Sequence, residues 1–203
     1  MELFDYKCHQ VKDEVGLMLY QQNYQELSGN LLTLDYLKKT MVFHVLKNDK
    51  VYAGFSLNVL EWSPLRYFSY LNEYVKSEIL IQPSKPLKEQ DFLEITSIYK
   101  QGRYKKDEML FYFYLFAKAY INAKRLKKPL ILGGSIVREV KLIQKEVLDV
   151  VLYHGLIDPE KIKGDTPKLF EIYCCETTDL LFNAGKEAFE KYFLQVFGSK
   201  KWH

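Results

Sequence analysis

The sequence predicts a single α+β domain in which helices flank a β-sheet. Its 203 residues contain no repeat, low-complexity tract or linker, so one domain is the simplest division. The stretch Phe92–Leu156 has the pattern strand, basic loop, long helix, strand, helix. With 48% hydrophobic and 15% aromatic residues, the chain can bury a large core, because Tyr and Phe supply much apolar area per residue.

The first part of the chain combines one strand with helical segments. Glu2–Val11 has apolar residues among polar ones and is predicted as a strand. Apolar residues recur at helical spacing over Lys12–Leu27, and Ser28–Asn30 with its central glycine ends that helix. Thr33–Lys39 is predicted to add one or two helical turns.

A β-hairpin is predicted next. Met41–Leu46 and Val51–Leu60 are rich in β-forming residues. They are joined by Lys47–Lys50, whose Asn and Asp tolerate the positive φ of a tight turn. Gly54 inside the second run indicates a bulge or a close approach of the backbone.

The segment Glu61–Asp91 is longer than an ordinary connection and is interpreted as an insertion or a functional loop. Its aromatic residues are mixed with charges, and Tyr67–Leu80 is predicted as an amphipathic helix. Pro83 and Pro86 then mark a connector.

The central unit begins with the predicted strand Phe92–Tyr99 and the polar loop Lys100–Lys106. A helix is expected over Asp107–Lys127, apolar nearly all round and therefore a covered, central helix. A strand over Pro129–Ser135 and a helix over Arg138–Tyr153 complete the unit.

The last part of the chain is predicted as loop, strand and helix. Ile157–Pro167 is rich in turn residues, and Lys168–Glu176 has the composition of a strand. Thr177–Gly185 is ambiguous, whereas Lys186–Phe197 has one apolar face and is predicted as a helix.

Several classes of function are disfavoured by composition. A net charge of +3 is too small to indicate nucleic-acid binding, and the basic run Lys124–Lys128 is explained by its place at a helix C-terminus. The three cysteines and four histidines lack metal-ligand spacing, so no metal is expected. No signal peptide or membrane-spanning run is seen, so the expected location is the cytoplasm.

Two short motifs resemble a known family. Leu93–Ser97 (LEITS) resembles the Glu-x-Ser/Thr-Arg strand of acyl-homoserine-lactone synthases and N-acyl amino acid synthases, with Ser97 in place of the arginine. A Gly-Gly-Ser strand end leads to Tyr153–Leu156, similar to the aromatic-x-x-Gly-Phe close of the GCN5-related N-acetyltransferase (GNAT) fold. The resemblance implies one GNAT-like domain over 1–203, with a mixed central sheet flanked by helices, an insertion at 61–91 and a C-terminal helix at 186–197.

The resemblance implies an acyl-donor site between two strands. The pyrophosphate of acetyl-CoA or a longer acyl-CoA would bind the loop, and the pantetheine arm would enter where the second strand ends; an acyl carrier thioester is the alternative donor. The residues implied for donor binding are Gln101, Gly102, Arg103, Tyr104, Lys105, Lys106, Gly133, Gly134 and Ser135. Free amides at a helix N-terminus suit a phosphate, although cations in a surface loop and glycines at a sharp turn need no ligand.

Three side chains are candidates for chemistry on a small-molecule amine. Glu94 lies in an apolar strand, where burial would raise its pKa and make it a candidate base; an outward or lysine-paired glutamate is the alternative. Thr96 shares the Glu94 face by period two and is a candidate substrate contact, or a β-former chosen for packing. Tyr153 is a candidate general acid, or a tyrosine that only packs.

Two hypotheses of function follow. The first is an N-acyltransferase that moves an acyl group from a CoA or acyl-carrier thioester to a small-molecule amine. The second is a non-catalytic binding or interaction protein that keeps the same fold. Ser97 stands where the family strand motif has arginine. Val151 stands where the family often has the tyrosine that serves as general acid. These departures keep the second hypothesis open.

Overall fold

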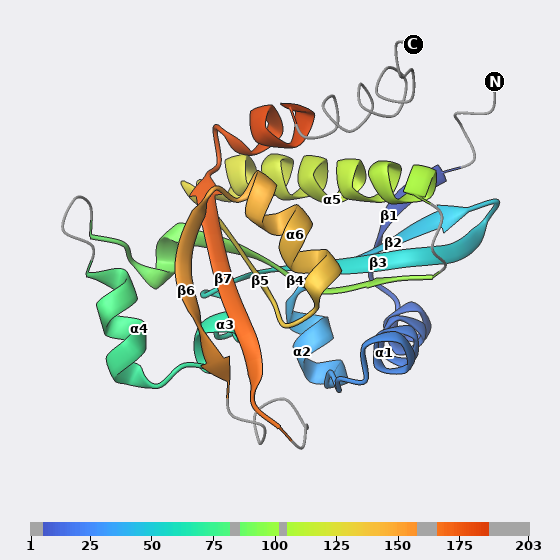
Figure 1. Ribbon diagram of the computed structural model, residues 1–203. Helices are drawn as coiled ribbons and strands as arrows, with labels where there is room; N and C mark the ends of the chain where they lie inside the picture. The colour runs from blue at the N-terminus through green and yellow to red at the C-terminus, as the bar shows by residue number, and fades with distance from the viewer. Residues whose placement is uncertain (1–5, 82–85, 102–104, 158–165, 187–203) are drawn as a thin grey trace, which may run out of the picture.

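The computed structural model describes residues 6–81, 86–101, 105–157 and 166–186, with the side chains of 105–110, 138 and 139 excluded. One mixed sheet of seven strands runs through them in the order β1-β2-β3-β4-β5-β7-β6 (Figure 1). The strands are β1 (Tyr6–Val11), β2 (Met41–Lys47), β3 (Lys50–Val59), β4 (Phe92–Lys100), β5 (Leu130–Ser135), β6 (Val150–Ile157) and β7 (Lys168–Glu176). Neighbouring strands are antiparallel except for β4 and β5, which are parallel.

Helices cover both faces of the sheet. The helices are α1 (Glu14–Ser28), α2 (Leu34–Lys39), α3 (Arg66–Ser69), α4 (Glu73–Leu80), α5 (Lys105–Leu126) and α6 (Arg138–Val147), with a 3₁₀ turn at Glu89–Asp91. In Figure 1, α5 and α6 lie on one face and α1 to α4 on the other. Residues 180–186 are also helical. This is the predicted α+β arrangement.

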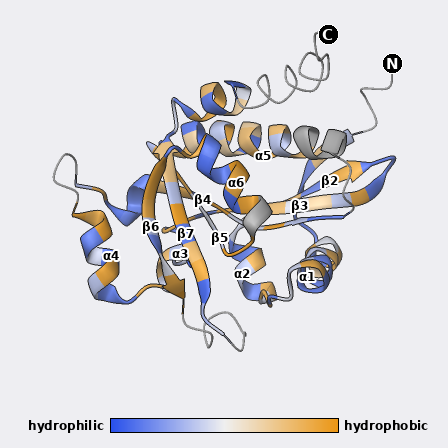
Figure 2. Ribbon diagram, in the orientation of Figure 1, coloured by the Kyte–Doolittle hydropathy of each residue, from blue (hydrophilic) through white to orange (hydrophobic). Residues whose placement is uncertain are grey.

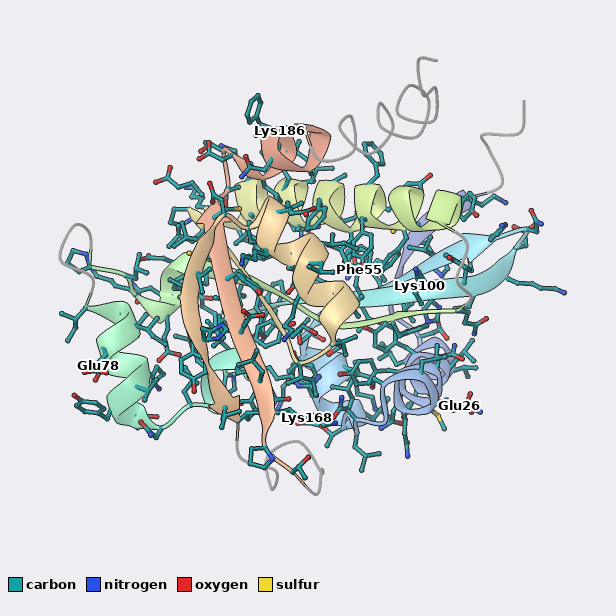
Figure 3. The ribbon with its side chains drawn as sticks, viewed as in Figure 1. Glu26, Phe55, Glu78, Lys100, Lys168 and Lys186 are labelled. Atoms are coloured by element: carbon teal, nitrogen blue, oxygen red, sulfur yellow. The ribbon has the colours of Figure 1, made fainter. Side chains whose placement is uncertain are left out.

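Each face of the sheet has its own apolar core. Phe55 of β3 packs against Phe111 of α5 with ring centroids 6.3 Å apart, and Figure 3 shows Phe55 in the interior below α5. On the other face, Phe68 of α3 meets Phe92 edge-on at 5.6 Å. Figure 2 shows the resulting pattern, with hydrophobic residues through the centre of the sheet and hydrophilic ones at the tip of the β2–β3 hairpin.

The turn signals of the first half are confirmed. Asp13 caps α1 by accepting a hydrogen bond from the Gly16 amide at 2.8 Å, and Gly29 ends the helix in the left-handed conformation. Asn48 and Asp49 both have positive φ, which a two-residue hairpin turn requires. Gly54 permits close packing, since a Cβ atom there would lie 2.6 Å from Tyr99 and 2.7 Å from Tyr20.

Two predicted helices are wrong in part. Tyr67–Leu80 is divided into α3 and α4, because Asn72 accepts from the Val75 amide and starts a new helix. The predicted Arg138–Tyr153 helix ends at Val147, and the residues from Val150 form β6 instead. This segment pairs with β7 along its length, so sheet pairing overrides the helical pattern.

Other predictions fall partly outside the described residues. The strand expected at Glu2–Val11 is seen from Tyr6 onward, and 1–5 are not described. The loop Ile157–Pro167 begins after Ile157, the last residue of β6, and 158–165 are not described. Almost all of the helix expected at Lys186–Phe197 lies outside the described residues.

A histidine is buried between β2 and α1. His44 is 3% exposed, stacks on Tyr20 with ring centroids 5.8 Å apart, and meets His9 edge-on at 5.8 Å. Its Nε2 atom has no hydrogen-bond partner among the described residues. Burial, followed by the charge of His9, lowers the pKa of His44 to about 4, while Asp13 opposes this shift. In the folded protein His44 is therefore a neutral imidazole at neutral pH.

We expect this histidine to destabilise the protein in acid. Unfolded His44 takes up a proton below pH 6.5 and folded His44 only near pH 4, so the unfolded state binds more protons and stability falls as pH drops through this window. The loss is about 3 kcal/mol. Urea unfolding from pH 6.5 to pH 4 should show a smaller decline for His44→Phe than for wild type. A His9→Gln control should keep most of the decline, and equal declines for wild type and His44→Phe would contradict the assignment.

Candidate functional site

The parallel strands β4 and β5 are paired only at their beginnings. Three pairs join them, Phe92 with Leu130, Leu93 with Ile131 and Glu94 with Leu132. The rest of β5 stays paired with β7 on its other edge, up to Ser135. The strands therefore part after Glu94.

A bulge in β4 causes this separation. The pairing of β4 with β3 shifts register between Gly54 and Ser56, and Ser97 has a φ of 54°. A non-glycine residue in the left-handed region costs roughly 1–2 kcal/mol, so surrounding contacts must hold it there. The bulge bends β4 away from the line of β5.

Three hydroxyl groups bind consecutive carbonyls at the bulge. Tyr67 donates to the Ile95 carbonyl at 3.0 Å, Ser56 donates to Thr96 at 3.3 Å, and Tyr20 donates to Ser97. These donors come from α3, β3 and α1. They supply hydrogen bonds to buried carbonyls that β5 does not reach, and an unpaired buried carbonyl would be costly.

A cavity of about 80 Å³ lies at the mouth of the opening. Its wall is formed by α1, α3, the bulge of β4, the end of β5, the start of α6 and Phe170 of β7. Lining residues with polar side chains are Tyr24, Ser28, Asn30, Arg66, Tyr67, Tyr70, Thr96, Ser97 and Ser135. Of the residues proposed from sequence, Thr96, Gly134 and Ser135 line this cavity.

Arg66 is a cavity residue that the sequence analysis missed. Its Nε donates to the Tyr70 hydroxyl at 2.9 Å, and its Nη1 donates to Ser97 Oγ at 3.0 Å and to the Tyr24 hydroxyl at 3.3 Å. The guanidinium carbon also lies 5.5 Å from the centre of the Tyr24 ring. The sequence signal was weak, being one arginine in an aromatic segment of unassigned role.

Glu94 is fully buried but does not line the cavity. Its Oε1 accepts from the Tyr67 amide at 2.7 Å, and its Oε2 accepts from the Arg66 amide at 3.0 Å and from Asn58 Nδ2 at 3.3 Å. Burial raises the pKa of Glu94, while these three donors and the Arg66 charge oppose the shift. The carboxylate thus binds the first turn of α3, with both oxygens occupied.

Tyr153 and Gly133 do not line the cavity. Tyr153 is in β6 rather than at a helix end, and its hydroxyl donates to the Leu156 carbonyl at 3.2 Å. A Cβ atom on Gly133 would collide with Leu148, the residue that caps α6, so this glycine makes room for the end of the helix. Gly134 does line the cavity, but its Cβ would also crowd Tyr67 and the Glu171 carbonyl at 3.0 Å. Internal packing accounts for both glycines.

The predicted phosphate loop is described only at its ends. Gln101 is exposed, and its amide donates to the Tyr52 carbonyl at 2.8 Å. Gly102, Arg103 and Tyr104 lie outside the described residues. Lys105 and Lys106 form the start of α5, and their side chains are not described.

Within the described part of the chain, no three His, Cys, Asp or Glu side chains are grouped so that they could hold a metal ion. None of the helices described here has both the length and the apolar character needed to cross a membrane.

Comparison with known proteins gives matches of structure only. No protein-family model matches the sequence, and no curated protein matches it. FeeM, an N-acyl amino acid synthase from uncultured soil microbes, aligns with a TM-score of 0.59 at 8% identity, covering 88% of this chain and 94% of its own.

Two further solved structures have the same fold. YncA, a putative acetyltransferase from Salmonella typhimurium solved with acetyl-CoA, has a TM-score of 0.54 at 11% identity and covers 85% of this chain and 94% of its own. The AHL synthase LasI has a TM-score of 0.54 at 12% identity, with coverages of 88% and 93%. The chain therefore has the GNAT fold, as the sequence motifs implied.

The contacts of Glu94 predict a structural cost when its charge is removed. Glu94→Gln puts an amide NH₂ against backbone N–H donors, and we expect it to lower the free energy of unfolding by about 2 kcal/mol. Denaturant titration measures this change. Glu78→Gln, at an exposed position on α4, is the matched control and should have no measurable effect. Equal stability of Glu94→Gln and wild type would show that Glu94 does not hold α3.

Proposed function

We propose that this chain, which has the GNAT fold, is an N-acyltransferase that moves an acyl group from a CoA or acyl-carrier thioester to a small-molecule amine. The observation that carries the proposal is the opening between β4 and β5, with a cavity at its mouth. FeeM and LasI, which share the fold, are named as synthases of N-acyl amino acids and AHL, and the YncA structure contains acetyl-CoA. These neighbours support acyl transfer as the reaction class.

The proposed reaction requires few catalytic groups. The amine nitrogen attacks the thioester carbonyl carbon, the C–S bond breaks, and the sulfur leaves as thiolate. The new amide nitrogen loses a proton and the thiolate gains one. Positioning of the two reactants can supply most of the acceleration, which suits a cavity lined by hydroxyl groups rather than by carboxylates.

We assign the donor to the gap between the strands. Beyond Leu132, the edge of β5 that faces β4 has no strand partner among the described residues, so its amides and carbonyls can bind an extended pantetheine arm. The pyrophosphate of a CoA would bind the loop Gln101–Lys106 at the start of α5, where amides of a helix N-terminus favour phosphate. A carrier-protein thioester would use the same gap for its arm.

We assign Glu94 a positioning role in place of the base role expected from sequence. Its carboxylate holds the first amides of α3, and α3 carries Arg66 and Tyr67 into the cavity wall. Thr96 remains a proposed substrate contact, because it lines the cavity. For Tyr153, the bond to Leu156 favours a packing role over the acid role.

A non-catalytic binding function is the second candidate. It is favoured by the occupied oxygens of Glu94 and by the absence of Tyr153 from the residues that line the cavity. This function predicts binding of a thioester or an amine without turnover. The two candidates are separated by measuring binding and product in the same samples.

Filling the cavity should abolish acyl transfer. Val140 of α6 borders the cavity, and Val140→Trp would occupy it. Leu142→Trp is the matched control, because Leu142 lies on the same helix, is 55% exposed and does not border the cavity. With acetyl-CoA or a long-chain acyl-CoA and a panel of small amines, amide formation should fall at least about tenfold in Val140→Trp and stay near wild type in the control.

Amide formation is measured by mass spectrometry, and binding of the thioester to the protein is measured by calorimetry. Binding of a thioester with no amide formed would support the non-catalytic function. No heat, no thermal shift and no amide with either donor would overturn the acyltransferase proposal.

A further inference from the structure

The cavity contains a guanidinium whose hydrogen bonds are incomplete. Arg66 uses Nε and Nη1 for its bonds to Tyr70, Tyr24 and Ser97, all of which are neutral hydroxyl groups. Nη2 has no hydrogen-bond partner among the described residues, and it is not one of the fully buried unpaired atoms. Because Arg66 lines the cavity, Nη2 is the guanidinium nitrogen that remains available to a ligand bound there.

The charge of Arg66 is also unpaired within the described structure. No described carboxylate forms an ion pair with its guanidinium. Glu94 feels the Arg66 charge, which opposes the rise of its pKa, but its oxygens accept from the α3 amides and from Asn58 rather than from the guanidinium. Because a guanidinium stays protonated at any ordinary pH and is costly to bury alone, an anion from outside the chain would stabilise it.

The ligand that suits this cavity carries one negative charge and an apolar body. Arg66 is the only charged side chain among the described residues that line it, so a monoanion is balanced and a phosphate dianion is not. Tyr24, Tyr67, Tyr70 and Phe170 supply aromatic walls. A guanidinium matches the planar geometry of a carboxylate.

The anion position adjoins the proposed site of transfer. Ser97, which accepts from Arg66, belongs to the β4 bulge, and Gly134 and Ser135 at the end of β5 line the same cavity. A carboxylate held by Arg66 would place the rest of a small molecule beside the gap between the strands.

We propose that Arg66 binds the carboxylate of the acceptor, so that the acceptor is an amino acid or a related amine that carries a carboxylate. This inference rests on the proposed acyl transfer. Arg66 then determines specificity, with Tyr24, Tyr70 and Ser97 orienting its guanidinium. A different role, polarising the thioester carbonyl, would affect every acceptor alike.

The test compares acceptors that differ only in the carboxylate. Leucine is paired with 3-methylbutylamine and phenylalanine with phenethylamine, using an acyl-CoA donor. For wild type, kcat/KM should favour each amino acid over its amine by roughly tenfold or more, since a charge-assisted contact is worth at least that factor. In Arg66→Met, kcat/KM should become equal for each amino acid and its amine. The KM for the amino acid should rise, and the KM for the amine should change little.

Two further variants separate specificity from folding. Arg125→Met removes the same charge from an exposed position on α5 and should keep the wild-type preference. Tyr24→Phe removes one hydroxyl that holds Arg66 and should weaken the preference in part, which tests the site even where Arg66→Met does not fold. An equal loss of activity toward amino acids and amines in Arg66→Met would overturn the inference and favour carbonyl polarisation.

Calorimetry without a donor distinguishes failure of this inference from failure of the proposed function. Wild type should bind the amino acids more tightly than the amines, and Arg66→Met should bind both equally. Amide formation with no preference for the carboxylate overturns the inference and leaves acyl transfer standing. Arg66-dependent binding of amino acids without any amide product supports the carboxylate site and contradicts acyl transfer. Equal binding of acids and amines by wild type overturns the inference.

Discussion

The bulge at Ser97 is the constraint on which the site depends. A regular β4 would continue its parallel pairing with β5, and no opening would exist between them. The bulge is held because three hydroxyls, from Tyr67, Ser56 and Tyr20, bind the carbonyls of consecutive residues. Side chains from one strand and two helices thus replace the hydrogen bonds that a neighbouring strand would supply, and the space left free becomes the candidate site.

The buried carboxylate of Glu94 connects this strand to the cavity wall. It lies at the last β4 residue paired with β5 and binds the amides of Arg66 and Tyr67. Tyr67 in turn donates to the bulge, and Arg66 donates to Ser97 Oγ. The short helix α3 is therefore hydrogen-bonded to β4 at two places, to Glu94 before the bulge and to Ile95 and Ser97 at the bulge. The opening and the guanidinium beside it form one hydrogen-bonded network, which explains why a charged residue is retained in an apolar strand.

Local sequence was sufficient wherever one residue type is required by backbone geometry. Gly29, Asn48 and Asp49 marked a helix end and a hairpin turn, because few residues tolerate positive φ. The same reasoning failed for Arg138–Tyr153, since β-branched residues after Val147 acquire their strand partner only when β7 lies beside them. Tyr153 was therefore placed at a helix end, and the role expected there lost its geometric basis.

The sequence by itself determined the first helix, the hairpin, the strand β4 and the long helix α5, because these follow from periodicity and turn chemistry. Only the tertiary structure decided which side chains meet. Arg66 is 31 residues from Ser97 and 42 from Tyr24 along the chain, and no local pattern relates them. The sequence marked Glu94 as a charge in an apolar strand, but whether it is buried, and whether it faces a ligand or a helix, depends on where α3 packs, which is set by long-range contacts.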